Sequence, residues 1–388
     1  MWWHFSFLGG IMSSLTKMQS RMIHYFSICE DPRKHRIRHN LIDIILITIL
    51  AVVCGEEGWE SFHEWAKDKR DYLRQYLMLE HGIPSPDTIR RVIERLNPQQ
   101  FLTAFTSWTQ ELGERVPGQI CIDGKAMRGV GDKSNPFRLV SAWCEDNQML
   151  LGMSKVGSKS NEIIGIYDIL DTLLLKPGDL ITIDAMGCQS KIVTKIAEQK
   201  ADYLIAVKQN QLGLWEEISN YFDQAIMMPE QAECDGVSKT NSAHGRKECH
   251  HVWATSNLDW LPQLEKWCNL KSIVCVYRRW TEKKNKKEEK RYYITSLEAN
   301  AELLHERIRR HWSVENEFHW HLDVAFNEDR SQISAEANEN LRIARAMALQ
   351  LLKAETTCKM GIKAKMRKCV RSEEYLHQVL LSGKFLMR

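Results

Sequence analysis

The order of strand-like and helical segments between residues 117 and 210 restricts the possible folds more than any other feature. Three short apolar segments typical of strands come first, and the Asp146-Asn147 turn between the second and third favours a hairpin. A helix is expected from about 161 to 174, then the apolar strand LITID, a helix across 190–199 and the strand YLIAV. Strands that alternate with helices in this way predict a mixed sheet with helices on its faces.

Three strands, a helix, a strand, a helix and a strand are the order of a ribonuclease H-like core. We therefore predict an α/β fold: a ribonuclease H-like mixed-sheet catalytic core with a β-rich insertion, preceded by a small all-helical domain. The expected boundaries are 1–19 for a disordered or extended start with an undetermined start codon, 20–112 for the helical domain, 117–210 and 300–355 for the core, 211–299 for the insertion and 356–388 for a basic C-terminal tail.

Further helices and strands are expected outside this core. In the insertion, HHVWAT, SIVCVYRRW and KRYYITSL predict strands, with TEKKNKKEE as a charged hairpin tip between the last two. Helical sequence returns at Ala301 and continues through Glu315, and another helix is expected from about Ala335 to Ala354. The apolar run from Leu41 to Cys54 has fourteen residues, fewer than the roughly 20 that span a bilayer, so it predicts a buried helix in a protein that is not in the membrane.

The net charge limits how the chain could bind nucleic acid. Its 388 residues hold 53 Lys and Arg against 50 Asp and Glu, a formal net charge of +3, so contacts with DNA would have to come from local basic segments. The eleven cysteines include no CxxC pair, which favours free thiols in a reducing cytoplasm over a disulfide framework.

Two aspartates end predicted strands. Asp123 ends the first strand of the core and Asp184 ends the fourth, and the predicted strand order brings these two strands side by side. Taken singly, each aspartate has a plain structural explanation, as a turn residue before Gly124 or as a helix N-cap. Together they form a pair of like charges, which repel unless a divalent metal lies between them.

A third carboxylate is expected from a later helix, and Glu315 is our choice. His311, Glu315, His319 and Asp323 follow one another at i+4 spacing, which places them on one helical stripe, and the neighbouring aromatic residues predict a partly buried environment. Three carboxylates would suit Mg²⁺ or Mn²⁺, and two such ions activate water and then a DNA 3′-hydroxyl for attack on phosphodiesters. A zinc site at the two histidines is a less favoured alternative, because the scattered thiols supply no further ligands.

Five separated motifs occur in the order IDGKAMRG, ITIDAMGCQ, ADYLIAVKQNQ, HGRKE and HWSVENEFHWHLDVAFNEDRS. With them the chain resembles the H-repeat-associated proteins, a branch of the DDE transposases of bacterial insertion sequences, over all but about the first dozen residues. The resemblance implies that Asp123, Asp184 and Glu315 are the catalytic triad and the metal ligands. It also implies cleavage and strand transfer of double-stranded DNA at element ends and target, and it makes the helical domain over 20–112 a candidate for binding the DNA ends. The expected active form is a homodimer in the cytoplasm that associates with the nucleoid when it acts.

The chain departs from this pattern in two places. Relatives in the wider group carry Tyr, Arg and Lys around the glutamate, where this chain has Ile308, His311 and Leu322. The segment ADYLIAVK usually continues with Gly-Asn-Gln, whereas Gln209 stands here in place of the glycine. Two alternatives to a transposase therefore stay open: a catalytically impaired, domesticated DNA-binding relic, and a metal-dependent nuclease that only hydrolyses DNA.

Other candidate residues surround the proposed triad. Lys125 and Arg128 follow Asp123 directly, which favours phosphate contact, and the resemblance adds Lys208, Asn210 and Arg246 as DNA-binding residues. His311 and His319 are expected to orient the metal ligands.

A basic stretch lies in the insertion. Lys271–Arg291 contains nine Lys or Arg against three Glu, interleaved with aromatic residues, and is either a solvated hairpin or a surface that follows phosphates.

Overall fold

The computed structural model describes residues 24–35, 37–111, 116–127, 138–157, 162–228, 233–243, 246–282, 285–331 and 333–382. The expected start over 1–19 and the candidate Arg128 lie outside these residues.

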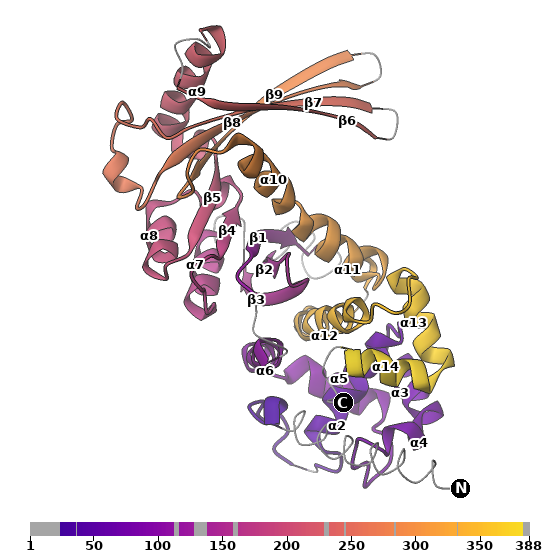
Figure 1. Cartoon of the computed structure of the whole chain (residues 1–388). Helices are drawn as coiled ribbons and strands as arrows, with labels where there is room; N and C mark the ends of the chain where they lie inside the picture. The colour runs from indigo at the N-terminus through magenta and orange to yellow at the C-terminus, as the bar shows by residue number, and fades with distance from the viewer. Residues whose placement is uncertain are drawn as a thin grey trace, which may run out of the picture.

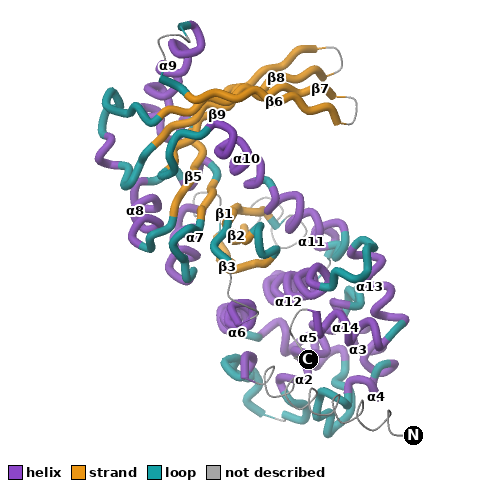
Figure 2. The backbone as a smooth tube through the Cα atoms, viewed as in Figure 1, coloured by secondary structure: helices purple, strands orange, loops and turns teal. Residues whose placement is uncertain are grey.

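A single mixed sheet of nine strands organises the described chain (Figures 1 and 2), in the order β3-β2-β1-β4-β5-β9-β8-β7-β6. β1 pairs with β4 and β4 with β5 in parallel, and the other neighbours are antiparallel. The strands are β1 (Gln119–Ala126), β2 (Arg138–Cys144), β3 (Met149–Val156), β4 (Leu180–Ile183), β5 (Asp202–Val207), β6 (Asp235–Ala243), β7 (Arg246–Thr255), β8 (Ser272–Glu282) and β9 (Asn285–Thr295).

One face of the sheet is covered by α7 (Glu162–Thr172), α8 (Ser190–Glu198) and α9 (Leu212–Met227). The strand residues on this face are mostly aliphatic, and Ile122, Ile183 and Ile205 are fully or nearly fully buried in its apolar cluster. Burial of such side chains is the main stabilising contribution to the fold.

The opposite face is covered by three consecutive helical segments and by a helical bundle. α10 (Ala301–His311) packs on β4, β5 and β7–β9 through Leu304 and Ile308. A π-helical turn, η5 (Val314–His319), follows and leads into α11 (Trp320–Val324). Phe318 of this turn stacks on Trp143 of β2 with ring centroids 5.1 Å apart, which fixes the turn against the sheet.

The bundle forms the end of the molecule opposite the arm of β6–β9 (Figure 1). Its helices share one apolar cluster with one face of β1–β3. They are α2 (Leu41–Val53), α3 (Trp59–Asp68), α4 (Arg70–Leu73), α5 (Pro86–Arg95), α6 (Pro98–Glu111), α12 (Ala335–Ala354), α13 (Ile362–Arg371) and α14 (Glu373–Ser382). α2 is the buried helix predicted from the apolar run, and no helix among the described residues combines the length and apolarity needed to cross a membrane.

Much of the predicted secondary structure is confirmed. The mixed α/β architecture, the five strands before residue 210 and their helices are present, and the helix predicted over 335–354 is α12 with the same bounds. β6 was not predicted, because its sequence DGVSKTNSA is polar. The predicted hairpin tip TEKKNKKEE is wrong in extent, since β8 runs to Glu282 and β9 begins at Asn285.

The expectation of a basic tail over 356–388 is wrong for residues up to 382. These residues form α13 and α14, which pack on the bundle through Cys369 and Leu376, both fully buried. Four basic residues of α13 are exposed, namely Lys363, Arg367, Lys368 and Arg371, whereas Lys365 is buried, so the charge pattern mainly reflects an amphipathic helix.

Glu355 links these two helices to the end of α12. Its fully buried carboxylate accepts hydrogen bonds from the backbone N–H of Thr357 at 2.8 Å and from the Tyr375 hydroxyl at 2.7 Å, and it pairs with Lys365 at 3.5 Å. Burial alone would raise its pKa, but these hydrogen bonds lower the pKa of Glu355 from 4.5 to about 2.

Replacement of Glu355 by Ala is expected to lower the free energy of unfolding by about 3 kcal/mol, because it leaves buried donors unpaired. The lowered pKa means that wild-type stability is lost as pH falls from about 4.5 towards 2, and the variant lacks this part of the acid dependence. Urea unfolding at several pH values measures both effects. Glu374→Ala, at an exposed site on α14, is the control and should change stability by no more than about 0.5 kcal/mol.

Candidate active site

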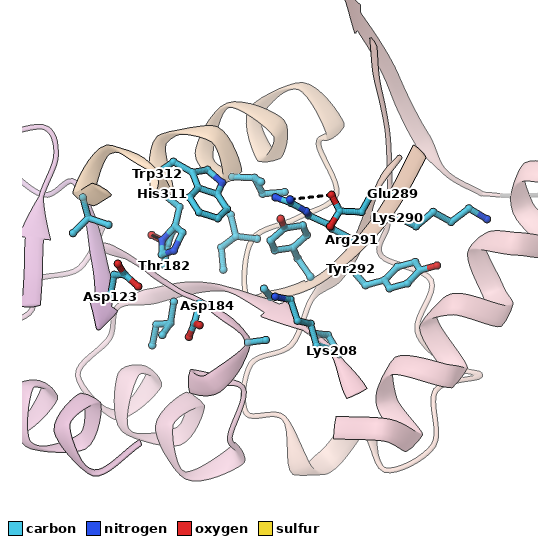
Figure 3. A pocket seen from close by; sticks show the side chains of 18 of the residues that line it. Asp123, Thr182, Asp184, Lys208, Glu289, Lys290, Arg291, Tyr292, His311 and Trp312 are labelled. Atoms are coloured by element: carbon cyan, nitrogen blue, oxygen red, sulfur yellow. Dashed lines mark hydrogen bonds and ion pairs between the residues drawn. The ribbon is translucent and has the colours of Figure 1, made fainter. Parts of the chain in front are cut away.

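Two aspartates lie side by side where the parallel ladder of β1 and β4 ends, in the interior of the sheet. In the parallel pairing of β1 with β4, Ile122 is opposite Ile183, so the next residues, Asp123 and Asp184, are neighbours. Asp184 also caps the short helix η2 (Ala185–Gly187), where its carboxylate accepts from the Met186 N–H at 3.0 Å. The structure therefore brings together the two aspartates that the sequence singled out, as Figure 3 shows.

The electrostatics of the pair are those of two crowded carboxylates. Burial raises the pKa of Asp123, and the charge of Asp184 raises it further. The two aspartates also affect Glu162 of α7: burial raises the pKa of Glu162, and their negative charges raise it further. Glu162 forms an ion pair with Arg138. A divalent cation between the aspartates would offset their repulsion, and carboxylate oxygens are the ligands that Mg²⁺ and Mn²⁺ prefer. Asp123 and Asp184 thus fit a metal site.

The same aspartates border a pocket of about 360 Å³ that also includes Glu315. Residues of β1, β4 and β5 line one side of this pocket, and residues of β9 and of the segment from α10 to η5 line the rest. Glu315 is exposed within η5, contrary to the predicted partial burial. Among the residues that the structure describes, no three His, Cys, Asp or Glu side chains are already gathered closely enough to hold a metal.

The predicted helical stripe is wrong because η5 interrupts the α-helix. The Trp320 N–H bonds to the carbonyl of Glu315, five residues earlier, so the side chains rotate relative to a regular helix. His311 meets Thr182, with Nδ1 2.9 Å from the hydroxyl, whereas His319 lies with Nδ1 3.6 Å from Asp123 Oδ2. Asp323 lies further away, in an ion pair with Lys125.

Both histidines are neutral at physiological pH. Burial lowers the pKa of His311 to about 4 and lowers the pKa of His319 well below 6.5. His319 therefore packs beside Asp123 as a neutral ring, and its position is compatible with orienting that carboxylate.

The candidate DNA-binding residues occupy different surroundings. The ammonium of Lys125 is held by Asp323, by Glu328 at 3.4 Å and by Asp329 at 3.6 Å. Lys208 borders the pocket. Asn210 donates from Nδ2 to the Ala185 carbonyl at 2.7 Å and so fixes the turn after Asp184. Arg246 begins β7, and its side chain lies outside the described part of the chain.

Pocket residues from β9 were not singled out by the sequence analysis. Glu289 and Arg291 come from the charged stretch Lys271–Arg291 of the insertion, Tyr293 lies just beyond this stretch on β9, and Trp312 follows α10. Because β9 pairs with β5, the insertion forms a wall of the pocket. The basic and aromatic character of Lys271–Arg291 was the available signal, but it gave no position relative to the aspartates.

Comparison with known proteins identifies the family to which this chain belongs. The chain matches the family described as Transposase DDE domain over residues 114–351, and the family described as DDE_Tnp_1-associated over residues 23–109. It belongs to the Transposase DDE domain family.

Three relatives illustrate the likeness. The H repeat-associated putative transposase YhhI of Escherichia coli strain K12 is 36% identical over 373 residues, which are 93% of this chain and 97% of YhhI. The putative transposase YncI of Escherichia coli O157:H7 is 36% identical over 372 residues, 93% of this chain and 94% of YncI. The inactive transposase YbfQ of strain K12 is 41% identical over 76 residues, 19% of this chain and 90% of YbfQ. The resemblance to H-repeat-associated proteins is therefore confirmed.

The carboxylate pair makes a prediction about stability. In the folded chain Asp123 resists ionisation, so stability falls as pH rises through its raised pKa, and removing the charge of Asp184 lessens that loss. Asp184→Asn should therefore have an equal or higher Tm than wild type at pH 7.5 in EDTA, and should lose the Tm increase that Mn²⁺ gives wild type. Differential scanning fluorimetry measures both, with the surface variant Asp171→Asn as control. A Mn²⁺-induced increase that persists in Asp184→Asn would show that the ion binds elsewhere.

Proposed function

We propose that this protein is a DNA transposase that cleaves and joins DNA strands by metal-dependent phosphoryl transfer. The observation that carries the proposal is the juxtaposition of Asp123 and Asp184, which directly follow the last pair of the parallel β1–β4 ladder and border a pocket that also contains Glu315. Membership of the Transposase DDE domain family supports the same reaction.

The strand order supports a ribonuclease H-like core. Three antiparallel strands, β3-β2-β1, are followed across the sheet by the parallel strands β4 and β5, with helices on both faces. On this proposal the core is 117–210 and 300–355, and β6–β9 form an insertion that continues the same sheet. The helices over 20–112 would be the domain that binds DNA ends.

Asp123 and Asp184 would hold the Mg²⁺ or Mn²⁺ ions, with Glu315 as the third ligand. Such a pair of ions supplies an activated nucleophile and offsets the charge that develops on the attacked phosphate. The chain itself positions the carboxylates that would hold these ions. The strand register holds the two aspartates together, and the Asn210 side chain fixes the turn that follows Asp184. His319, with Nδ1 3.6 Å from Asp123 Oδ2, would help to orient that carboxylate. Glu315, on the exposed surface of η5, has room to approach the aspartates.

The substrate on this proposal is double-stranded DNA, both at the element ends and at the target, and the active form is a homodimer on DNA in the cytoplasm and nucleoid. The open pocket and the cationic side chains that border it suit a phosphodiester backbone.

A DNA-binding relic is the second candidate, and the helix that carries Glu315 favours it. Ile308 and Leu322 are buried and His311 is neutral, so these three positions bring no positive charge to the pocket. The relic would bind DNA without cleaving it, and a hydrolytic nuclease would cleave without joining.

Asp123→Asn, Asp184→Asn and Glu315→Gln should each reduce Mn²⁺-dependent cleavage and joining by at least about a hundredfold, because each removes a metal ligand. The assay uses labelled duplexes copied from the DNA that borders the coding region, with pre-cleaved ends to measure joining. Glu317→Gln is the matched control: Glu317 also lies on η5 but pairs with Lys353 at 2.8 Å outside the pocket, and this variant should keep wild-type activity.

Cleavage without joined product in wild type would favour the nuclease. Binding without any cleavage would favour the relic. Full activity in Asp184→Asn would contradict the carboxylate assignment itself.

A further inference from the structure

The pocket has a positive side as well as a negative one. Among the described residues that border it, the cationic side chains are Lys208, Lys290 and Arg291. Two of these lie at neighbouring strand positions: Val207 is paired with Tyr292 in the antiparallel ladder of β5 and β9, so Lys208 and Arg291 follow directly beyond the last pair. The carboxylates are on β1 and β4, and the cations are on β5 and β9.

Alternation along the strands decides which face each side chain occupies. One set of neighbouring residues packs in the apolar cluster beneath α7–α9, namely Ile122, Ile183, Val207 and Tyr292. Since side chains alternate between faces, Asp123, Asp184, Lys208 and Arg291 emerge on the other face, beneath α10 and η5. Lys290 shares the face of Tyr292, and its amine pairs with Asp223 of α9. Figure 3 shows Lys290 pointing away from the aspartates and Arg291 pointing towards Trp312.

Two neighbours hold the Arg291 guanidinium in the pocket. Nη2 donates to Glu289 Oε2 at 2.9 Å, and the guanidinium carbon lies 5.7 Å from the centroid of the Trp312 ring. Burial alone would lower the pKa of Arg291, but hydrogen bonds to Glu289 and Tyr293 raise it above the usual value, so the group stays charged. Arg291 and Glu289 are 32% and 40% exposed, which leaves both accessible to a ligand.

We propose that Arg291 binds a phosphate of the DNA strand that lies over the aspartates, and that Glu289 occupies the guanidinium until that phosphate displaces it. A guanidinium presents several donors in one plane and matches the paired oxygens of a phosphate, so the exchange replaces one charge-assisted pair with another. Trp312 limits the swing of the guanidinium. The inference rests on the proposed function, because it takes DNA as the ligand.

Equilibrium binding to DNA tests the inference without requiring chemistry. The probe is a fluorescent duplex copied from the DNA that borders the coding region, in Ca²⁺, with a gel to verify that it stays intact. Arg291→Ala should weaken binding about tenfold and reduce the slope of log K against log salt by about 0.9, the value for one lost phosphate contact. Lys195→Ala is the control: Lys195 lies on α8, on the opposite side of the sheet, pairs with Asp171 and does not border the pocket. This variant should change both quantities much less.

Neutralising Glu289 should have the opposite effect on DNA binding from the removal of Arg291. Glu289→Gln should tighten binding about threefold, because the competitor for Arg291 is neutral, and this gain should disappear in the Arg291→Ala background. Glu288→Gln, next in the strand and bonded to Tyr277 on the other face, controls for a general loss of negative charge. If the Glu289–Arg291 pair only stabilised β9, both single variants would weaken binding and lower the Tm together.

An unchanged salt slope in Arg291→Ala, or tighter binding by Glu289→Gln that persists without Arg291, would overturn the inference. Cleavage by wild type in Mn²⁺ is measured in parallel, so a failure of the proposed function is recognised separately. Absence of DNA binding by wild type would overturn both.

Discussion

The parallel pairing of β1 with β4 is the interaction on which the rest of the site depends. It aligns Ile122 with Ile183, and the backbone hydrogen bonds of the ladder hold the next two residues, Asp123 and Asp184, against their mutual repulsion. Burial raises the pKa of Asp123, and the neighbouring charge of Asp184 raises it further. The apolar residues of both strands, buried beneath α7–α9, supply the stabilisation that offsets this repulsion. The repulsion at the site and the packing elsewhere are thus linked by the strand register, because a one-residue slip of either strand would turn its carboxylate to the other face of the sheet.

The π-helical turn η5 is the second constraint. A regular helix would place His311, Glu315 and His319 on one stripe, whereas the longer turn directs His319 to Asp123 and leaves Glu315 exposed at the pocket. Phe318 holds the turn by stacking on Trp143 of β2, so its position is fixed from the sheet. π-Helical turns are rare in proteins as a whole, but those that do occur are often found at functional sites.

The sequence predicted what short-range pattern controls. The strands and helices before residue 210 have clear apolar periods, and the proximity of the two aspartates followed from their order. Three features depend on long-range contacts and were missed. The π turn leaves no local signature, and the polar strand β6 is formed by its pairing with β7. The role of the charged stretch depends on the β5–β9 ladder, which joins residues about ninety positions apart. α13 and α14 were mistaken for a tail because their basic residues dominate the composition, while burial of Cys369 and Leu376 decides the structure.

The continuity of the sheet from β3 to β6 has a mechanical consequence. An inserted domain on a flexible linker could rotate relative to the core, but β9 is hydrogen-bonded to β5, and β5 to β4, which ends at Ile183 just before Asp184. The arm of β6–β9 therefore cannot pivot at its base without breaking main-chain hydrogen bonds of the core itself. Nucleic acid bound along this arm would therefore lie at a fixed distance from the carboxylates, because the arm and the carboxylates belong to one continuous sheet.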